Sequence, residues 1–436
     1  MKPIPEILSE KLAGAFATLS REDLPEDFTP TVTAAADTRF GDYQSNAAMV
    51  VAKALKTNPR ELASTLAGHM ELGDVAAPAE IAGPGFINFR LHNEFLANRL
   101  SQLLSDERLG VPPANAPQRL LIDFSSPNIA KPMHIGHIRS TIIGDALSRI
   151  GRFLEHEVIT DNHIGDWGTP IGQVLYGWKH ELDEEAFERD PIAELLRLYQ
   201  SVKKAFESDP AVEAACLEET VKLQAGDPTN LGLWRKFCDI TASDRDRTYA
   251  RLDITFDRTL GESFYDERLA PLVEELLAGG IAEESEGAVC VFSNGDLDPK
   301  ADPLLVHRDG EWVPVPCLIR KKDGGFNYAT TDIASIDYRV AEEKADQVLY
   351  VVDDRQSLHF RQVFEVARQR GIDADLKHVA FGKILGGDRK PYKTREGAVP
   401  ALSDVLDDAV VRARKVVDEK SDPSLPENQR AEIAER

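Results

Sequence analysis

Residues 122–137 read IDFSSPNIAKPMHIGH, and they lie where a strand is expected to turn into a helix. The run 120–124 is short and apolar, which is typical of a buried parallel strand. Over residues 138–154 the apolar side chains recur with helical spacing. The stretch is therefore predicted to be a strand–loop–helix junction of an α/β fold.

The loop of this junction places two histidines and a glycine at the predicted start of the helix. Backbone N–H groups there are unpaired and lie at the positive end of the helix dipole, so they favour phosphate. Gly136 has no side chain to keep a flat adenine off the backbone, while His134 and His137 can share one side of the first turn and donate to phosphate oxygens. The junction is a candidate nucleotide site, and the alternative is a pair of histidines that only cap a helix.

Residues 124–145 resemble the signature of class I aminoacyl-tRNA synthetases, in the form SSPNIAKPxHxGHxRST that arginyl-tRNA synthetases carry. Further resemblances follow in family order at 161–169, 328–332 and 350–360. The chain is thereby identified as a member of the arginyl-tRNA synthetases, from about residue 1 to its end. The resemblance implies an arginine–tRNA ligase that binds L-arginine, ATP with Mg²⁺, and tRNA(Arg).

The composition is that of a globular enzyme with two or three domains, 436 residues long and 42% hydrophobic. No apolar run approaches 18 residues and the start of the chain lacks the apolar core of a signal peptide, so we expect a cytoplasmic protein without a membrane span. The four cysteines show no metal-ligand spacing, so no structural zinc is expected. We also expect a monomer.

The net charge of −23 opposes the approach of a polyanion such as RNA, so the charge must be unevenly placed. Acidic residues are concentrated at 181–219, and basic residues gather between 361 and 415. The basic cluster surrounds a separate motif and is a candidate phosphate-binding region. The alternative is a solvated face.

The element pattern and the resemblance predict a Rossmann-like, doubly wound parallel sheet in residues 118–400, divided by a helical and β insertion at about 179–316. In its second half we expect a strand at 348–352, a helix at 357–370 and a strand at 379–381.

Two further regions flank this catalytic domain. Residues 1–110 are expected to form an additional α/β domain, which in the family reaches the tRNA. Its Phe40, Tyr43 and Gln44 have the chemistry to stack on and hydrogen-bond an unpaired base, although ordinary packing of a turn explains them equally well. Residues 401–436 are expected to begin a helical region, and the family's anticodon-binding domain is expected to be absent.

The resemblance assigns the arginine guanidinium to Tyr328 and Asp332, and less directly to Glu262. Selection of a planar guanidinium requires carboxylates placed for forked hydrogen bonds and an aromatic wall. Tyr328 and Asp332 are one helical turn apart if a helix begins there, which would aim both into one pocket. The alternative for Asp332 is a charge that only stabilises a helix start.

Smaller polar groups are expected around the α-amino and carboxylate ends of arginine. The resemblance assigns this role to Ser126, Asn128 and Gln356, and places Asp123 at the edge of the same pocket. Asn128 and Gln356 follow predicted parallel strands, and such sheets bind ligands beyond the carboxyl ends of their strands.

The second catalytic loop of the family is matched by KPYKT at 390–394, which keeps two lysines and a hydroxyl. Lys390, Lys393 and Lys131 are expected to neutralise charge on the triphosphate together with His134 and His137. The alternative interpretation of residues 390–394, if only these residues are considered, is a basic loop on the surface. The rival functions are adenylation of a small carboxylate without tRNA, and a non-catalytic relative that binds RNA or protein.

Overall fold

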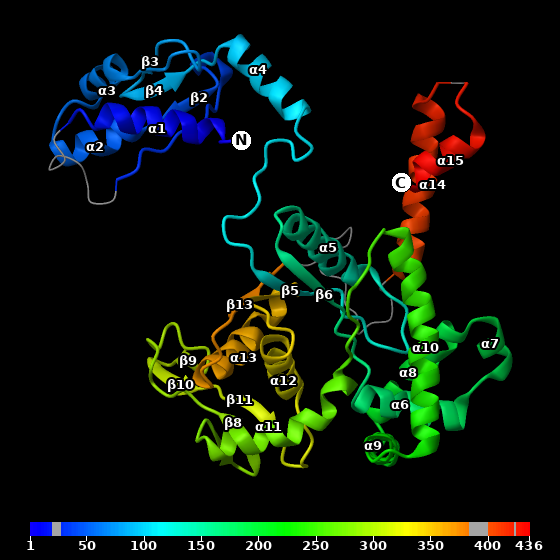
Figure 1. The fold of residues 1–436 in the computed structure, drawn as a ribbon. Helices are drawn as coiled ribbons and strands as arrows, with labels where there is room; N and C mark the ends of the chain where they lie inside the picture. Colours follow the sequence, from blue (N-terminus) through cyan, green and yellow to red (C-terminus); the bar gives the residue numbers. More distant parts are fainter. Residues whose placement is uncertain (20–27, 383–399, 423) are drawn as a thin grey trace. The chain divides into compact units, whose positions relative to one another are not determined.

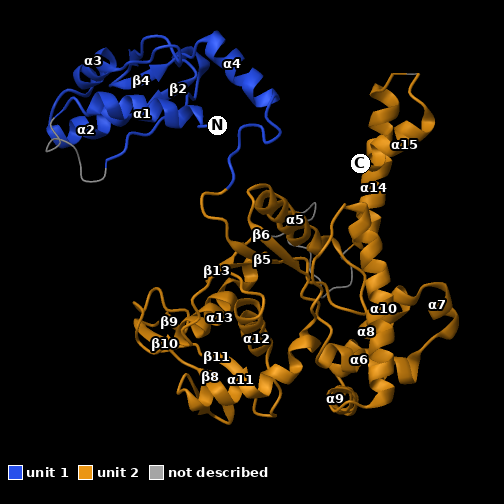
Figure 2. Ribbon diagram, viewed as in Figure 1, with its two compact units in different colours: residues 1–113 blue, residues 114–436 orange. Residues whose placement is uncertain are grey.

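The computed structural model describes residues 1–19, 28–382, 400–422 and 424–436, and the chain divides into two compact units, Met1–Pro113 and Ala114–Arg436 (Figure 1 and Figure 2). Each unit encloses its own hydrophobic core. Within the described ranges, no helix is long and apolar enough to cross a membrane.

Unit 1, Met1–Pro113, is an antiparallel sheet in the order β1-β2-β4-β3, packed with helices. Its elements are α1 (Ile4–Phe16), β1 (Thr33–Ala34), the 3-10 helix η2 (Thr38–Phe40), β2 (Tyr43–Ser45), α2 (Ala47–Leu55), α3 (Pro59–His69), β3 (Glu80–Ala82), β4 (Phe86–Phe89) and α4 (Asn93–Leu104). Leu8 and Leu12 of α1, Val51 of α2 and Leu66 of α3 are fully buried against Ile87 of β4. This burial of one apolar side of α1, α2 and α3 is what holds the unit together.

Unit 2 is built on a parallel sheet of four strands in the order β13-β12-β5-β6. The strands are β5 (Arg119–Asp123), β6 (Glu157–Asp161), β12 (Gln347–Tyr350) and β13 (Asp375–His378). The chain leaves β5 in one direction to form β6 and later returns to the other side of β5 to form β12 and β13. This reversal between β5 and β12 confirms a Rossmann-like, doubly wound sheet, and it creates the crevice in which such sheets bind ligands.

The predicted strand at 379–381 was wrong by a few residues, because β13 is Asp375–His378. β13 is an edge strand in which the outward Asp375 and Lys377 form an ion pair, so its sequence lacks the apolar run that marks a buried strand. The apolar residues that follow it lie beyond the strand, where Val379 N–H donates to the carbonyl of Tyr350 at 2.8 Å and Phe381 forms an isolated parallel bridge with Asp353.

The helices that cover this sheet are α5 (Ile138–Phe153), α12 (Tyr328–Ala341) and α13 (Ser357–Gln369), with short 3-10 helices η3 (Ile135–His137) and η5 (Asp354–Gln356). Ile333 and Ile336 of α12 and Val363 of α13 are fully buried with Val348 of β12. α5 comes very close to the sheet, since a Cβ atom on Gly144 would lie 2.1 Å from the ring of Phe124. These contacts fix the starts of the helices beside the carboxyl ends of the strands.

Between β6 and α12 the chain forms a helical part and a β part. The helices are α6 (Thr169–Glu181), α7 (Glu184–Arg189), α8 (Pro191–Phe206), α9 (Pro210–Gln224), α10 (Pro228–Arg251), η4 (Glu262–Tyr265) and α11 (Asp266–Ala278). The strands are β7 (Ala282–Ser285), β8 (Ala288–Val291), β9 (Leu305–Arg308), β10 (Glu311–Pro314) and β11 (Cys317–Arg320). β11, β8 and β7 form an antiparallel sheet, and β9 and β10 form a hairpin. The helices α14 (Leu402–Lys420) and α15 (Glu427–Glu435) follow the parallel sheet.

Candidate active site

His134 and His137 lie at the start of α5 with their rings stacked, 3.9 Å between centroids. His134 caps the turn, because its Nδ1 accepts the backbone N–H of Gly136 at 3.1 Å. The Nδ1 of His137 in turn accepts the backbone N–H of His134 at 3.1 Å. A Cβ atom on residue 136 would lie 2.7 Å from the His134 ring, so glycine is needed there for this packing.

These hydrogen bonds assign the protonation of the two rings. Each Nδ1 is an acceptor, so the ring proton of each neutral imidazole lies on Nε2, which is left as a donor. Burial lowers the pKa of His134, and burial together with the neighbouring His134 lowers the pKa of His137 to about 3. The pair therefore presents neutral N–H donors at neutral pH rather than positive charge, and it caps the helix at the same time.

Lys131 precedes this pair and lies with its Nζ 3.6 Å from the ring centroid of Tyr199 on α8. Burial lowers the pKa of Lys131. The other two expected cations, Lys390 and Lys393, lie outside the described residues. The described residues that flank 383–399 both contact this region: Arg139 of α5 donates to the carbonyl of Gly382, and the carbonyl of Pro400 accepts the N–H of Ile135 at 3.2 Å.

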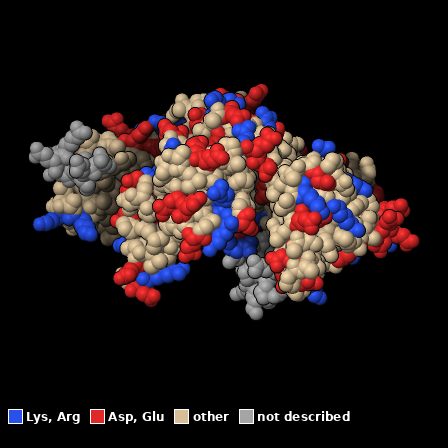
Figure 3. All heavy atoms as spheres, turned by 90° about the horizontal axis from the view of Figure 1, so that it is seen from below, with Lys and Arg blue, Asp and Glu red and all other residues tan. Residues whose placement is uncertain are grey.

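The basic cluster between 361 and 415 is largely occupied by ion pairs where the structure describes it. The carboxylate partners are Glu365 and Asp296 for Arg368, Asp337 and Glu275 for Arg370, Asp408 for Arg412, and Asp418 and Glu427 for Arg414. The charge of these arginines is therefore compensated within the chain. Figure 3 shows acidic and basic side chains interspersed on one face of the molecule.

Asp332 and Tyr328 lie on the first turns of α12, as their spacing predicts. The Oδ2 atom of Asp332 lies 2.6 Å from Nε2 of His359, at the start of α13. The ring of Tyr328 packs edge-on against His359, 4.9 Å between centroids. Tyr328 is 63% exposed, so its ring remains available as a wall. Since α13 follows β12, this contact places both residues near the carboxyl edge of the sheet.

Glu262 begins η4, and its backbone N–H donates to the carbonyl of Ile164 beyond the end of β6. Burial raises the pKa of its carboxyl group to about 7, with Asp166 and Asp332 adding like charge and His163 opposing the shift. Asp166 holds this turn, because its carboxylate accepts the N–H of Ser263 at 2.9 Å and the hydroxyl at 2.6 Å. Asp332 thus contributes to the raised pKa of Glu262, although the two residues come from different elements.

The last residues of three neighbouring strands are joined by a buried arginine of α12. Arg339 donates to Asp123 at 2.7 Å and to Asp161 at 2.8 Å, and it lies 5.2 Å from the ring centroid of Tyr350. Ser126 donates to the same Asp123 at 3.0 Å. Asp123 is expected at the edge of the arginine pocket, and in the structure its charge is compensated by Arg339.

The remaining expected residues are dispersed over both units. Asn128 is exposed after β5, with its side-chain oxygen over the backbone of Gly165, and Gln356 is exposed after β12. Phe40 of unit 1 is 45% exposed, whereas Tyr43 and Gln44 are half-buried in β2 and Tyr43 packs against the core. For Tyr43 the packing explanation therefore has direct support.

Sequence reasoning missed two residues of this region, His359 and Asp166. His359 lies three positions after Gln356, so the two residues share a side of the first turn of α13. Because Gln356 was predicted to bind arginine, this spacing could have indicated His359 as well. Asp166 lies within the motif at 161–169. In the part of the chain that the structure describes, no group of three or more His, Cys, Asp or Glu side chains is placed to hold a metal.

Comparisons with known proteins account for nearly all of the chain. Residues 99–435 match the family described as tRNA synthetases class I (R), catalytic domain, and residues 4–91 match the arginyl tRNA synthetase N terminal domain. The chain is 42% identical to an arginine–tRNA ligase of Cellvibrio japonicus and 43% identical to one of Citrobacter koseri, in each case over 99% of this chain and 73% of the relative. The chain belongs to the arginyl-tRNA synthetases.

A solved arginyl-tRNA synthetase from Plasmodium falciparum has the same fold, with a TM-score of 0.76 and 26% identity. The likeness covers 100% of this chain and 72% of that one. The family resemblance that the motifs indicated is thereby confirmed, as is the class I catalytic fold.

Proposed function

We propose that the protein is an arginine–tRNA ligase, which activates L-arginine with ATP and transfers it to tRNA(Arg). The carboxylate of arginine attacks the α-phosphorus of ATP and expels pyrophosphate. A terminal ribose hydroxyl of the tRNA then attacks the carbonyl carbon of the arginyl-adenylate, which forms the ester, breaks the acyl–phosphate bond and releases AMP. The observation that carries the proposal is the contact of Asp332 and Tyr328 with His359, in a chain that matches the class I catalytic family and keeps the two stacked histidines.

The arginine end of the site is suited to a guanidinium. Two carboxylates from different elements, Asp332 and Glu262, can each accept from a planar group with several donors, and Tyr328 supplies an aromatic face. Ser126, Asn128 and Gln356 follow the ends of β5 and β12 and are proposed for the α-amino and carboxylate groups.

The ATP end of the site needs no side-chain nucleophile. The Nε2–H donors of His134 and His137 can bind phosphate oxygens as charge builds on them. Gly136 is proposed to let the nucleotide approach the backbone. Lys131 is proposed to leave the ring of Tyr199 and contact the triphosphate, with Lys390 and Lys393 as further cations. Mg²⁺ would be carried largely by the phosphate oxygens, as is usual for this ion.

For the tRNA we propose Phe40, Tyr43 and Gln44 of unit 1 as contacts. Phe40 supports the proposal most directly, because a large apolar side chain that is 45% exposed on a short turn is suited to stacking on a base. A cytoplasmic location and a monomeric state belong to the same proposal.

ATP–pyrophosphate exchange with arginine, run with and without tRNA(Arg), tests the function. Arginine-dependent exchange together with arginylation of tRNA is the expected result. Exchange without any transfer to tRNA would favour a relative that only adenylates a small carboxylate. Absence of exchange under both conditions would favour a non-catalytic relative.

A further inference from the structure

His359 contacts both residues of the guanidinium pocket that lie on α12, although it belongs to α13. Its Nε2 lies 2.6 Å from Oδ2 of Asp332, and its ring lies 4.9 Å from that of Tyr328 at an interplanar angle of 62°. The side chains of His359 and Asp332 are only 15% and 17% exposed. The contact is therefore protected from water and holds two helices together at the place where arginine is proposed to bind.

The chemistry of this contact limits how Asp332 can bind a ligand. An ionised carboxylate only accepts hydrogen bonds, so the proton in this contact belongs to His359 Nε2. The hydrogen bond occupies Oδ2 and leaves Oδ1 of Asp332 for the substrate. A guanidinium that found both oxygens free would bind this carboxylate with two parallel bonds. With one site of Oδ2 taken by His359, fewer sites of Asp332 remain for the guanidinium, and the donors that it does not bind are available to a second acceptor. Glu262 is the candidate, because Asp332 is among the groups that raise the pKa of its carboxyl group.

We propose that His359 is a positioning residue that sets specificity for arginine, by presenting one oxygen of Asp332 and the face of Tyr328 to a guanidinium that is shared with Glu262. This inference rests on the proposed ligase function. A planar guanidinium has donors on three nitrogens and can span two carboxylates, whereas the compact ammonium of lysine has its donors on one atom. The arrangement therefore favours arginine over lysine by geometry as well as by charge.

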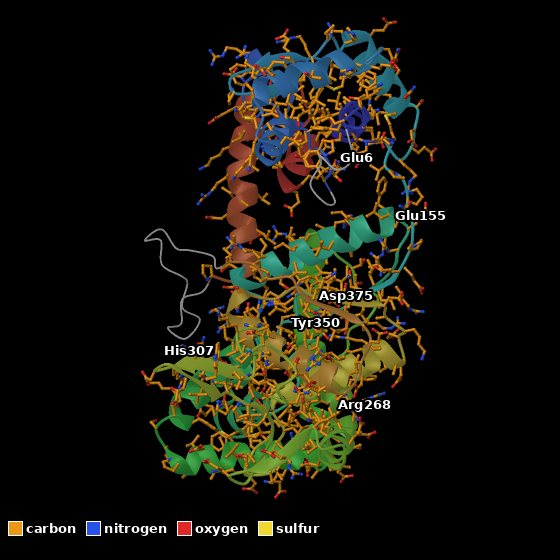
Figure 4. The ribbon with its side chains drawn as sticks, turned by 90° about the vertical axis from the view of Figure 1, so that its left-hand side faces the viewer. Glu6, Glu155, Arg268, His307, Tyr350 and Asp375 are labelled. Atoms are coloured by element: carbon orange, nitrogen blue, oxygen red, sulfur yellow. The ribbon has the colours of Figure 1, made fainter. Side chains whose placement is uncertain are left out.

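Three substitutions of His359 separate this role from simple packing. His359→Gln keeps an N–H donor at nearly the reach of Nε2, His359→Asn carries the same amide one methylene shorter, and His359→Ala removes the donor. His307→Ala is the matched control, because His307 is an exposed histidine of β9 (Figure 4) that contacts Trp312. For each 436-residue protein, titration calorimetry gives the Kd for arginine and for lysine. Pyrophosphate exchange with tRNA gives kcat and the KM for arginine and for ATP.

We expect His359→Ala and His359→Asn to raise the Kd and KM for arginine at least about tenfold, which corresponds to about 1.4 kcal/mol, and to leave the KM for ATP within about twofold. The preference for arginine over lysine should fall in both variants. His359→Gln should restore arginine binding to within about threefold of wild type. His307→Ala should behave as wild type. Thermal unfolding of each variant shows whether the fold is kept.

Wild-type arginine affinity in His359→Ala or His359→Asn would overturn the inference while leaving the ligase function in place. Equal weakening by Gln and Asn would also overturn it, since the position of the donor would then be irrelevant. If His359→Ala fails to fold, the arginine affinities of His359→Gln and His359→Asn still test whether the position of the donor matters. A wild-type protein that neither binds nor activates arginine would instead overturn the proposed function.

Discussion

Glu262 is the residue whose protonation should report arginine binding. Its pKa is raised to about 7 by burial and by the nearby Asp166 and Asp332, so in the free protein at pH 6.5 about three-quarters of the molecules hold a proton there. A bound guanidinium favours the ionised form and displaces that proton. We expect arginine affinity to increase as the pH rises from about 5.5 to about 8, with release of about 0.7 proton per arginine at pH 6.5.

Calorimetry in buffers of different ionisation enthalpy measures this proton release directly. Glu262→Gln, which has no proton to lose, should bind arginine more weakly and with little release. The stability of the unliganded protein should depend on pH in the opposite direction to arginine affinity. The pKa of Glu262 is higher in the folded protein than its unfolded value of 4.5, so the free energy of unfolding falls as the pH rises from 4.5 through about 7. Uptake of protons on arginine binding would contradict the assignment.

Asp332 supplies the second carboxylate, and its charge can be removed with almost no change of shape. Asp332→Asn should raise the Kd for arginine about 10- to 150-fold, because a hydrogen bond to a charged group contributes about 1.5–3 kcal/mol. The KM for ATP should change little. Asp408→Asn, which alters an exposed carboxylate of α14 paired with Arg412, is the control. An unchanged Kd for arginine would remove Asp332 from the pocket.

At the scale of elements, α12 is held across the sheet by Arg339, which joins Asp123 at the end of β5 to Asp161 at the end of β6. These two carboxylates are opposite one another in the strand register, and all three side chains are almost completely buried. Arg339→Met leaves both carboxylates buried without a cation, so we expect it to lower the free energy of unfolding by about 3–5 kcal/mol.

Urea denaturation of the full chain tests this expectation for α12. Arg412→Met is the matched control, because Arg412 and Asp408 are 79% and 71% exposed and such surface pairs contribute at most about 1 kcal/mol. A loss below about 1 kcal/mol for Arg339→Met would show that the triad does not hold the helix. Because Tyr328 and Asp332 begin the same helix, arginine binding should weaken along with stability.

At the scale of the whole molecule, the small-ligand site and the proposed tRNA contacts belong to different units. Every residue assigned to arginine or ATP lies in Ala114–Arg436, and Met1–Pro113 has a separate core. We therefore expect residues 114–436, expressed alone, to bind arginine with a Kd within about threefold of the full chain. Its affinity for tRNA should fall, because Phe40, Tyr43 and Gln44 are then missing.

Calorimetry with arginine and filter binding with tRNA(Arg) test the two statements separately. The tRNA measurement should be repeated at several salt concentrations, because a chain of net charge −23 depends on local cationic contacts to bind a polyanion. Loss of arginine binding in a folded fragment would show that unit 1 supports the site. Unchanged tRNA affinity would remove the three residues of unit 1 from the interface.

The sequence by itself determined the local parts of this protein. The strand and helix on either side of residues 122–137 follow from an apolar run and from helical spacing, and the placement of Tyr328 and Asp332 one turn apart follows from the same periodicity. These features need only the backbone geometry of neighbouring residues, so a single stretch of chain contains the whole signal.

Only the tertiary structure decided which buried charges are partners. Arg339 is separated from Asp123 by 216 residues, and His359 from Asp332 by 27, so no local spacing pairs them. The predicted position of the last strand, 379–381, was also wrong because of a tertiary contact. The polar residues of β13 form a strand because they pair with β12. A carboxylate removed from water must be satisfied by whichever donor shares the same enclosed space, and that space exists only after the sheet, α12 and α13 have packed together.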